Sequence, residues 1–147
     1  MKHIILMAIL LGAWQAPERK DCSNIKVVVT GFRSEKGEGF LALYANQEGF
    51  PLDPAKATDK LKAPIEQGHA AFEFKAVKPG TYAIIALHDE NKNGKMDRNP
   101  LGMPREGYGA SNNPKMPLFG PPTFESAVFR TTPGAMTITI PLHYYPH

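Results

Sequence analysis

Oxygen-bearing side chains recur at alternate positions between residues 89 and 97. Asp89, Asn91 and Asn93 come first, and Gly94 follows where a chain wrapped around an ion must turn sharply. A second carboxylate follows at Asp97. This spacing predicts a loop that encloses one hard cation. The expected ligands are the side chains of Asp89, Asn91, Asn93 and Asp97 and the backbone carbonyl of Lys95.

Calcium (Ca²⁺) is the ion that this set of oxygen ligands favours, because magnesium prefers a rigid octahedron and zinc prefers clustered His and Cys. The first half of the pattern matches the calcium loop of helix-loop-helix proteins, but Pro100 stands where that loop carries a bidentate glutamate. Only Asp89 and Asp97 are charged ligands, unless Glu90 or Glu106 folds back. We therefore expect a dissociation constant of about 10⁻⁵–10⁻³ M. The alternative is a solvated turn, since Asn, Asp and Gly are residues that turns use.

Catalytic chemistry has a weaker basis in the sequence. Ser111 with His69 or His88 and an aspartate could form a hydrolase triad, but no Gly-x-Ser-x-Gly turn surrounds Ser111. We therefore expect a protein that is not an enzyme, with no catalytic residues. A secreted hydrolase that uses the Asp89–Asn113 loop is the alternative, and a plain sandwich without an ion is another.

The first residues have the pattern of a signal peptide. A short positive region at Lys2 and His3 precedes the uncharged apolar stretch Ile4–Trp14, and Ala13 and Ala16 are small residues where a signal peptidase could cut. We expect residues 1–16 to be removed and residues 17–147 to form a single domain, exported to the periplasm or the cell exterior. No segment of this mature chain predicts a transmembrane span, and its single cysteine, Cys22, excludes an internal disulfide.

Composition favours many turns, because 14 prolines and 13 glycines fall in 147 residues. The net charge of +3 is scattered along the chain and forms no basic run, so we expect no nucleic-acid partner. Any partner would be an unidentified protein or carbohydrate.

Short β-branched and apolar segments separated by turns predict the elements that position the loop. We expect strands at Ile25–Phe32, Gly39–Ala45, His69–Lys75, Thr81–His88 and Met136–Leu142, and a turn of helix passing into a strand at Phe124–Arg130. The first two strands are expected to pair as a hairpin. Asp53 as N-cap before Pro54 predicts one short helix, Asp53–Leu61. The pattern favours an all-β fold, an antiparallel β-sandwich.

A long proline-rich segment, His88–Pro122, follows the most apolar strand. We expect its larger side chains to pack the loop onto the sheet; they are Tyr108, Met116, Leu118, Phe119 and Phe124. The alternative is an exposed recognition surface for sugar or protein. At the carboxyl end, we expect His143, Tyr144, Tyr145 and His147 to form an exposed tail.

Three stretches carry a resemblance to a known family: Val77–Tyr82, His88–Asp97 and Leu101–Asn113. Together they resemble an exported bacterial family known as a domain of unknown function (family 2141), with Ala110 where an aromatic residue is expected. The Pro-Gly-Thr-Tyr turn also looks like the transthyretin-like, Ig-like sandwich of carboxypeptidase regulatory domains. The resemblance implies a Greek-key fold of about seven strands and transfers no functional residues.

Overall fold

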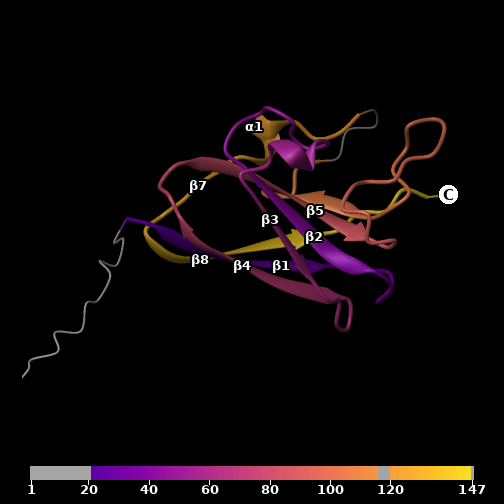
Figure 1. Ribbon diagram of the computed structural model, residues 1–147, viewed down its shortest axis with the longest axis horizontal. Helices are drawn as coiled ribbons and strands as arrows, with labels where there is room; N and C mark the ends of the chain where they lie inside the picture. The colour runs from indigo at the N-terminus through magenta and orange to yellow at the C-terminus, as the bar shows by residue number, and fades with distance from the viewer. Residues whose placement is uncertain (1–20, 116–119, 147) are drawn as a thin grey trace, which may run out of the picture.

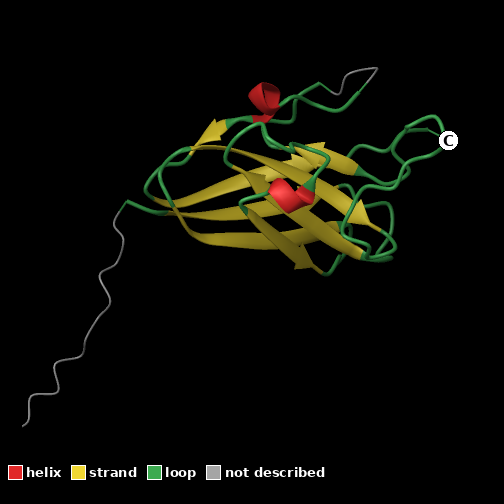
Figure 2. Cartoon of the chain, turned by 45° about the horizontal axis from the view of Figure 1, so that its top comes forward, coloured by secondary structure: helices red, strands yellow, loops and turns green. Residues whose placement is uncertain are grey.

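Two β-sheets pack face to face in the computed structural model, which describes residues 21–115 and 120–146 (Figures 1 and 2). The smaller sheet has the strand order β4-β1-β8, and the larger has the order β3-β2-β5-β6, with β7 beside β5. The strands are β1 (Ser23–Thr30), β2 (Glu38–Tyr44), β3 (Asp59–Ala63), β4 (His69–Val77), β5 (Thr81–Asp89), β6 (Tyr108–Ala110), β7 (Phe129–Arg130) and β8 (Gly134–Pro141). The all-β sandwich expected from the sequence is confirmed.

The main core lies between the two sheets. Along β1, Ile25, Val27 and Val29 are buried while the residues between them are exposed or half-buried, as the two-residue period of a strand requires. Leu41 on β2 and Ile84 on β5 belong to the same buried cluster. These strands therefore form a fixed platform for the loops at their ends.

The outer face of the larger sheet carries a second apolar cluster. Phe40 and Tyr44 on β2 and Ile85 and Leu87 on β5 are buried there. Loop residues cover them, with Met96 among those that are partly buried. Because both faces of β5 are covered, its sequence is a nearly continuous apolar run.

Strand pairing differs from the expected hairpin of the first two strands. β1 pairs with β4 and β8, and β2 pairs with β3 and β5, so the hairpin prediction was wrong. The residues between β1 and β2 carry the chain from one sheet to the other. One pair in the otherwise antiparallel sandwich, β1 with β8, is parallel.

The helix expected at Asp53–Leu61 is much shorter in the structure. A single 3₁₀ turn spans η1 (Pro54–Lys56), where Asp53 Oδ1 accepts a hydrogen bond from the Ala55 N–H at 3.0 Å. The chain is extended again at Ala57 and enters β3, in which Leu61 pairs with Leu41 of β2. The prediction was therefore wrong beyond the first turn, because pairing with the open edge of β2 outweighs the modest helix preference of Ala and Lys.

The chain after β5 is long and mostly irregular, as expected, but it contributes β6 to the larger sheet. The expected helical turn passing into a strand is present as α1 (Phe124–Ala127), capped by Thr123, followed by β7. Tyr108 is buried against the sheet and Phe124 packs on the same cluster, whereas Met116, Leu118 and Phe119 lie outside the described residues.

The sequence analysis predicted a signal peptide at the amino end and an exposed tail at the carboxyl end of the chain. The signal peptide expected at residues 1–16 lies outside the described residues. Tyr144 and Tyr145 are half-buried, so the exposed tail expected there was wrong for these two residues, whereas His143 is exposed and His147 lies outside the described residues. Among the residues that the structure describes, no helix has the length and apolar character needed to cross a membrane.

Candidate metal-binding loop

Asp89 is the last residue of β5, and its side chain is fully buried. Its Oδ1 accepts a hydrogen bond from the Asn93 N–H at 3.1 Å, and its Oδ2 accepts one from the Gly94 N–H at 2.7 Å. Gly94 has φ 74°, in the left-handed region that side chains disfavour. A Cβ on Gly37 would lie 2.1 Å from the Asp89 carbonyl oxygen, so the chain packs closely behind this turn. Asp89 thus folds the loop back over the end of the strand.

Glu106 is a second buried carboxylate, with only 3% of the residue exposed. Its Oε1 accepts from the Glu90 N–H at 3.0 Å and its Oε2 from the Asp97 N–H at 3.2 Å. Burial raises the pKa of Glu106; the two backbone donors act against this, and the charges of Asp97 and Asp89 add to it. One side chain therefore ties together the first and last parts of the loop. The sequence analysis named Glu106 only as a residue that could fold back.

Asp97 receives the side chains of both loop asparagines. Its Oδ1 accepts from Asn93 Nδ2 at 2.8 Å, and its Oδ2 accepts from Asn91 Nδ2. The Asn91 Oδ1 accepts from the Asn93 N–H at 3.3 Å, and the Asn93 Oδ1 accepts from the Lys95 N–H at 3.1 Å. Three of the expected ligand side chains therefore converge, and Asp89 is joined to them through the backbone of Asn93.

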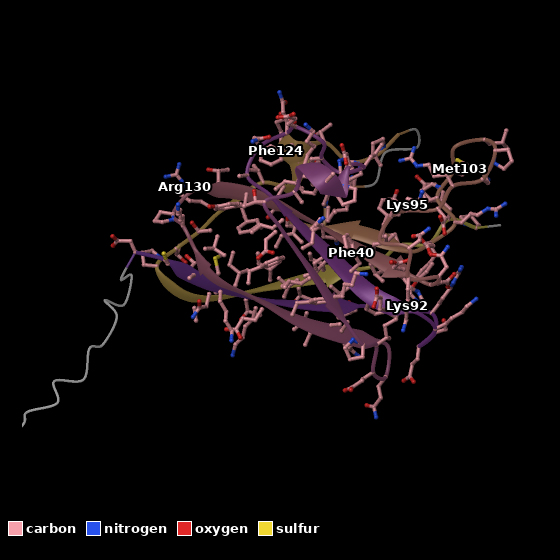
Figure 3. The ribbon with its side chains drawn as sticks, viewed as in Figure 1. Phe40, Lys92, Lys95, Met103, Phe124 and Arg130 are labelled. Carbon is pink, nitrogen blue, oxygen red and sulfur yellow. The ribbon has the colours of Figure 1, made fainter. Side chains whose placement is uncertain are left out.

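Amide oxygens are essential to any ion site in this loop. No group of three or more His, Cys, Asp or Glu side chains that could hold a metal occurs in the described parts of the chain. In the structure the Nδ2 atoms of Asn91 and Asn93 face Asp97, while their Oδ1 atoms accept backbone N–H groups. Lys92 and Lys95 are exposed side chains of the same loop (Figure 3).

His88, just before the loop, has both ring nitrogens engaged and is fully buried. Its Nε2 lies 2.7 Å from the Lys36 carbonyl oxygen, so Nε2 must carry the proton. Its Nδ1 lies 2.8 Å from the Tyr144 hydroxyl. The Tyr144 ring also covers Gly107, where a Cβ would lie 2.3 Å from it. His88 therefore connects the strand end to the carboxyl-terminal segment.

Glu90 forms a bidentate ion pair with Arg33. The guanidinium donates from Nε to one carboxylate oxygen at 2.8 Å and from Nη2 to the other at 2.9 Å. This bonding lowers the pKa of Glu90 and raises that of Arg33. Arg33 also lies over the Tyr144 ring, 4.9 Å from its centroid. Glu90 thus anchors the base of the loop, and both of its carboxylate oxygens are engaged by Arg33.

Ser111 and His69 are not brought together. Ser111 follows β6 in the larger sheet and is fully buried, and its Oγ accepts from the Ile84 N–H at 2.9 Å and donates to the Ala127 carbonyl. His69 begins β4 in the smaller sheet and is exposed. The Ser111 hydroxyl joins α1 to β5, which is a structural role.

Replacing this hydroxyl should lower stability. We expect Ser111→Ala to reduce the free energy of unfolding by about 1–3 kcal/mol, because a buried backbone N–H and a buried carbonyl each lose a partner. Urea unfolding measures the change. Ser126→Ala, at an exposed serine of α1, is the control and should stay within about 0.5 kcal/mol of the parent. Equal stabilities for the two variants would contradict the structural role of Ser111.

Comparison with known proteins gives one family. Residues 27–139 match the family described as "Uncharacterized protein conserved in bacteria (DUF2141)". No curated protein and no solved structure matches the chain.

Proposed function

Since the chain belongs to the uncharacterized bacterial family DUF2141, we propose its function from its own geometry: it is an exported, non-catalytic β-sandwich module whose Asp89–Asp97 loop binds calcium. The bound ion would fix the irregular segment after β5, which then serves a structural role or presents a surface to a protein or carbohydrate partner. Loops on rigid sandwiches commonly carry such binding surfaces.

The convergence of Asn91 and Asn93 on the Asp97 carboxylate is the observation that carries the proposal. A turn made only by local side-chain-to-backbone bonds does not require this convergence. The Asp89 carboxylate holds the loop from its beginning, and each of its oxygens has a second lone pair free for a cation. Lys95 would add its backbone carbonyl. A site made only of carboxylate, amide and carbonyl oxygens suits calcium better than zinc.

The buried carboxylates favour a cation for an electrostatic reason. Asp89 and Glu106 are buried, and Asp97 is half-buried beside them. The charges of the two aspartates raise the pKa of Glu106, so these groups repel one another. A divalent ion held between Asp89 and Asp97 would relieve this repulsion.

The proposal also includes export of the protein and a transthyretin-like Greek-key topology. The charged and apolar pattern of residues 1–16 supports export to the periplasm or the exterior. The two packed sheets are compatible with a transthyretin-like Greek key. In millimolar extracellular calcium, a dissociation constant of about 10⁻⁵–10⁻³ M gives substantial occupancy.

Calorimetric titration of chelator-treated protein tests the site directly. We expect one calcium per chain with a dissociation constant of about 10⁻⁵–10⁻³ M, and much weaker binding of magnesium. Asp97→Asn should abolish the heat of binding, since it removes one of two charged ligands. The control is Glu66→Gln, an equal loss of charge at an exposed site outside the loop. No saturable heat with the parent protein would favour the plain sandwich.

A further inference from the structure

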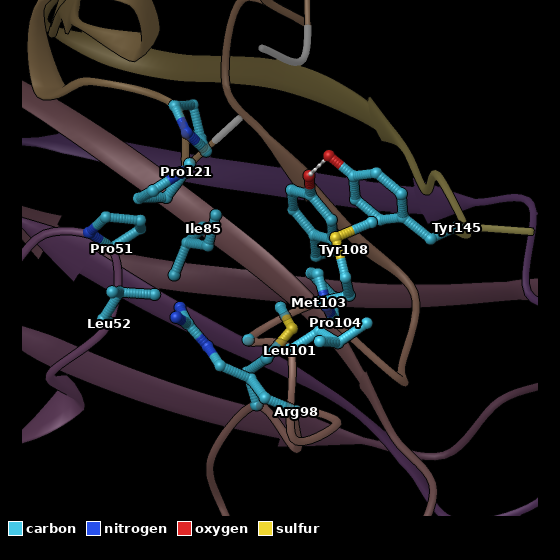
Figure 4. A pocket seen from close by; sticks show the side chains of 14 residues that line it. Pro51, Leu52, Ile85, Arg98, Leu101, Met103, Pro104, Tyr108, Pro121 and Tyr145 are labelled. Atoms are coloured by element: carbon cyan, nitrogen blue, oxygen red, sulfur yellow. Dashed lines mark hydrogen bonds between the residues drawn. The ribbon is translucent and has the colours of Figure 1, made fainter. Parts of the chain in front are cut away.

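A cavity of about 170 Å³ lies on the outer face of the larger sheet, beside the candidate ion loop (Figure 4). Ile85 of β5 lies at its base and Tyr108 of β6 forms part of its wall. The other walls come from Pro51–Leu52, the segment 96–104, Gly120–Pro122 and the carboxyl-terminal Tyr145. Six separate parts of the chain therefore line one space.

The rim of this cavity is exposed and apolar. Leu52, Leu101 and Met103 are 47%, 87% and 37% exposed, and they are the large apolar residues that the described part of the chain leaves exposed. All three line the cavity. Exposed apolar residues that gather at one concave site, and not singly over the surface, indicate a binding site.

Polar side chains in the lining are few, and none of them is acidic. The Arg98 side chain extends toward the space between Leu52 and Ile85 (Figure 4). The stacked rings of Tyr108 and Tyr145 place their hydroxyls 3.4 Å apart. No Asp or Glu side chain is among the lining residues. The wall therefore offers a cation and two hydroxyl groups without an acidic counterpart.

Arg98 lies close enough to Tyr108 for its positive charge to affect the pKa of the Tyr108 hydroxyl. Burial raises the pKa of Tyr108, and the positive charge of Arg98 opposes this rise. The guanidinium is exposed and takes part in no ion pair with the described residues. An anion in the cavity could thus be met by the guanidinium of Arg98.

We propose that this cavity binds a small amphipathic monocarboxylate, with its apolar body over Ile85 and its carboxylate at Arg98. The size argues for one aromatic ring or a short aliphatic chain, because an apolar cavity of about 150 Å³ accommodates benzene. The absence of acidic lining residues argues against a cationic ligand. The site is separate from the ion ligands, although Arg98 directly follows Asp97.

Nuclear magnetic resonance titration of the full chain distinguishes the ligand classes. The probes are phenylacetate and hexanoate, with 2-phenylethanol and 2-phenylethylamine as the neutral and cationic analogues of the first. We expect saturable shifts at Ile85 and Leu52, with a carboxylate bound at least about tenfold more tightly than either analogue. Phenylacetate and hexanoate together show whether a ring or a chain is preferred. Equal binding of acid, alcohol and amine would overturn the proposal.

Two variants test the assigned contacts. Arg98→Gln should weaken carboxylate binding about tenfold and leave 2-phenylethanol unchanged, while Arg105→Gln, at an exposed arginine outside the cavity, should change neither. Leu101→Asp, at a position too exposed to affect folding, should also weaken carboxylate binding. The titrations are repeated with calcium and with chelator. Carboxylate binding in both conditions would show that this cavity works independently of the proposed ion loop. Carboxylate binding that survives Arg98→Gln unchanged would reject the assignment.

Discussion

Calcium is expected to raise the melting temperature of the chelator-treated protein by about 10 °C. A ligand at 100 times its dissociation constant stabilises the folded state by about 2.7 kcal/mol when only that state binds it. For a domain of this size, 1 kcal/mol corresponds to a change of roughly 4 °C. Thermal unfolding followed by circular dichroism, at saturating calcium and in excess chelator, measures the difference.

Matched variants assign this effect to the loop. Asp97→Asn should melt at the same temperature with calcium and with chelator, because the ion has lost a charged ligand. Glu66→Gln changes the net charge equally and should keep the full shift. If the parent protein melts at one temperature whatever the calcium concentration, the loop is a solvated turn.

Removing the Glu106 side chain is expected to destabilise the fold by about 2–5 kcal/mol. Glu106→Ala leaves the N–H groups of Glu90 and Asp97 without an acceptor, and each buried loss contributes about 1–3 kcal/mol. Glu106→Gln keeps one acceptor oxygen and should lie between this variant and the parent. Urea denaturation at neutral pH gives the free energies.

A surface glutamate provides the comparison for Glu106. Glu48 is 71% exposed in its side chain and pairs with Lys56 at 3.0 Å, so Glu48→Ala should change stability by less than about 1 kcal/mol. Calcium affinity should also fall in Glu106→Gln, although Glu106 is not an expected ligand, because the loop ends are less well held. A Glu106→Ala protein as stable as the parent would show that the loop does not depend on this carboxylate.

Most strands of the sandwich could be predicted from the sequence, because alternating apolar residues indicate a strand that is buried on one face. The buried alternation of Ile25, Val27 and Val29 made β1 recognisable. Pairing was harder, because proximity in sequence suggested a hairpin where the chain crosses between sheets. β3 was missed because Asp53 and Pro54 are a true helix start, yet the local signal extends for only one turn.

The ion loop was recognisable because its side chains are spaced within one short segment. Asp97 and the two asparagines converge as their alternation predicts. The role of Glu106 could not be read in this way, since its partners lie 16 and 9 residues away along the chain. A glutamate directly before the small and aromatic residues of β6 was the available signal. The cavity beside Arg98 was also missed, because its lining residues come from six separate segments of the chain.

The parallel pairing of β1 with β8 affects how the chain can acquire its structure during synthesis. β1 is the central strand of its sheet, and one of its two neighbours is β8, the last strand of the described residues. Until the ribosome reaches residue 141, the valine-rich segment of β1 has an unsatisfied hydrogen-bonding edge that other chains can join. A translation product that stops before Gly134 would therefore be prone to self-association. Burial of the central strand β1 therefore has to wait until β8 has been synthesised.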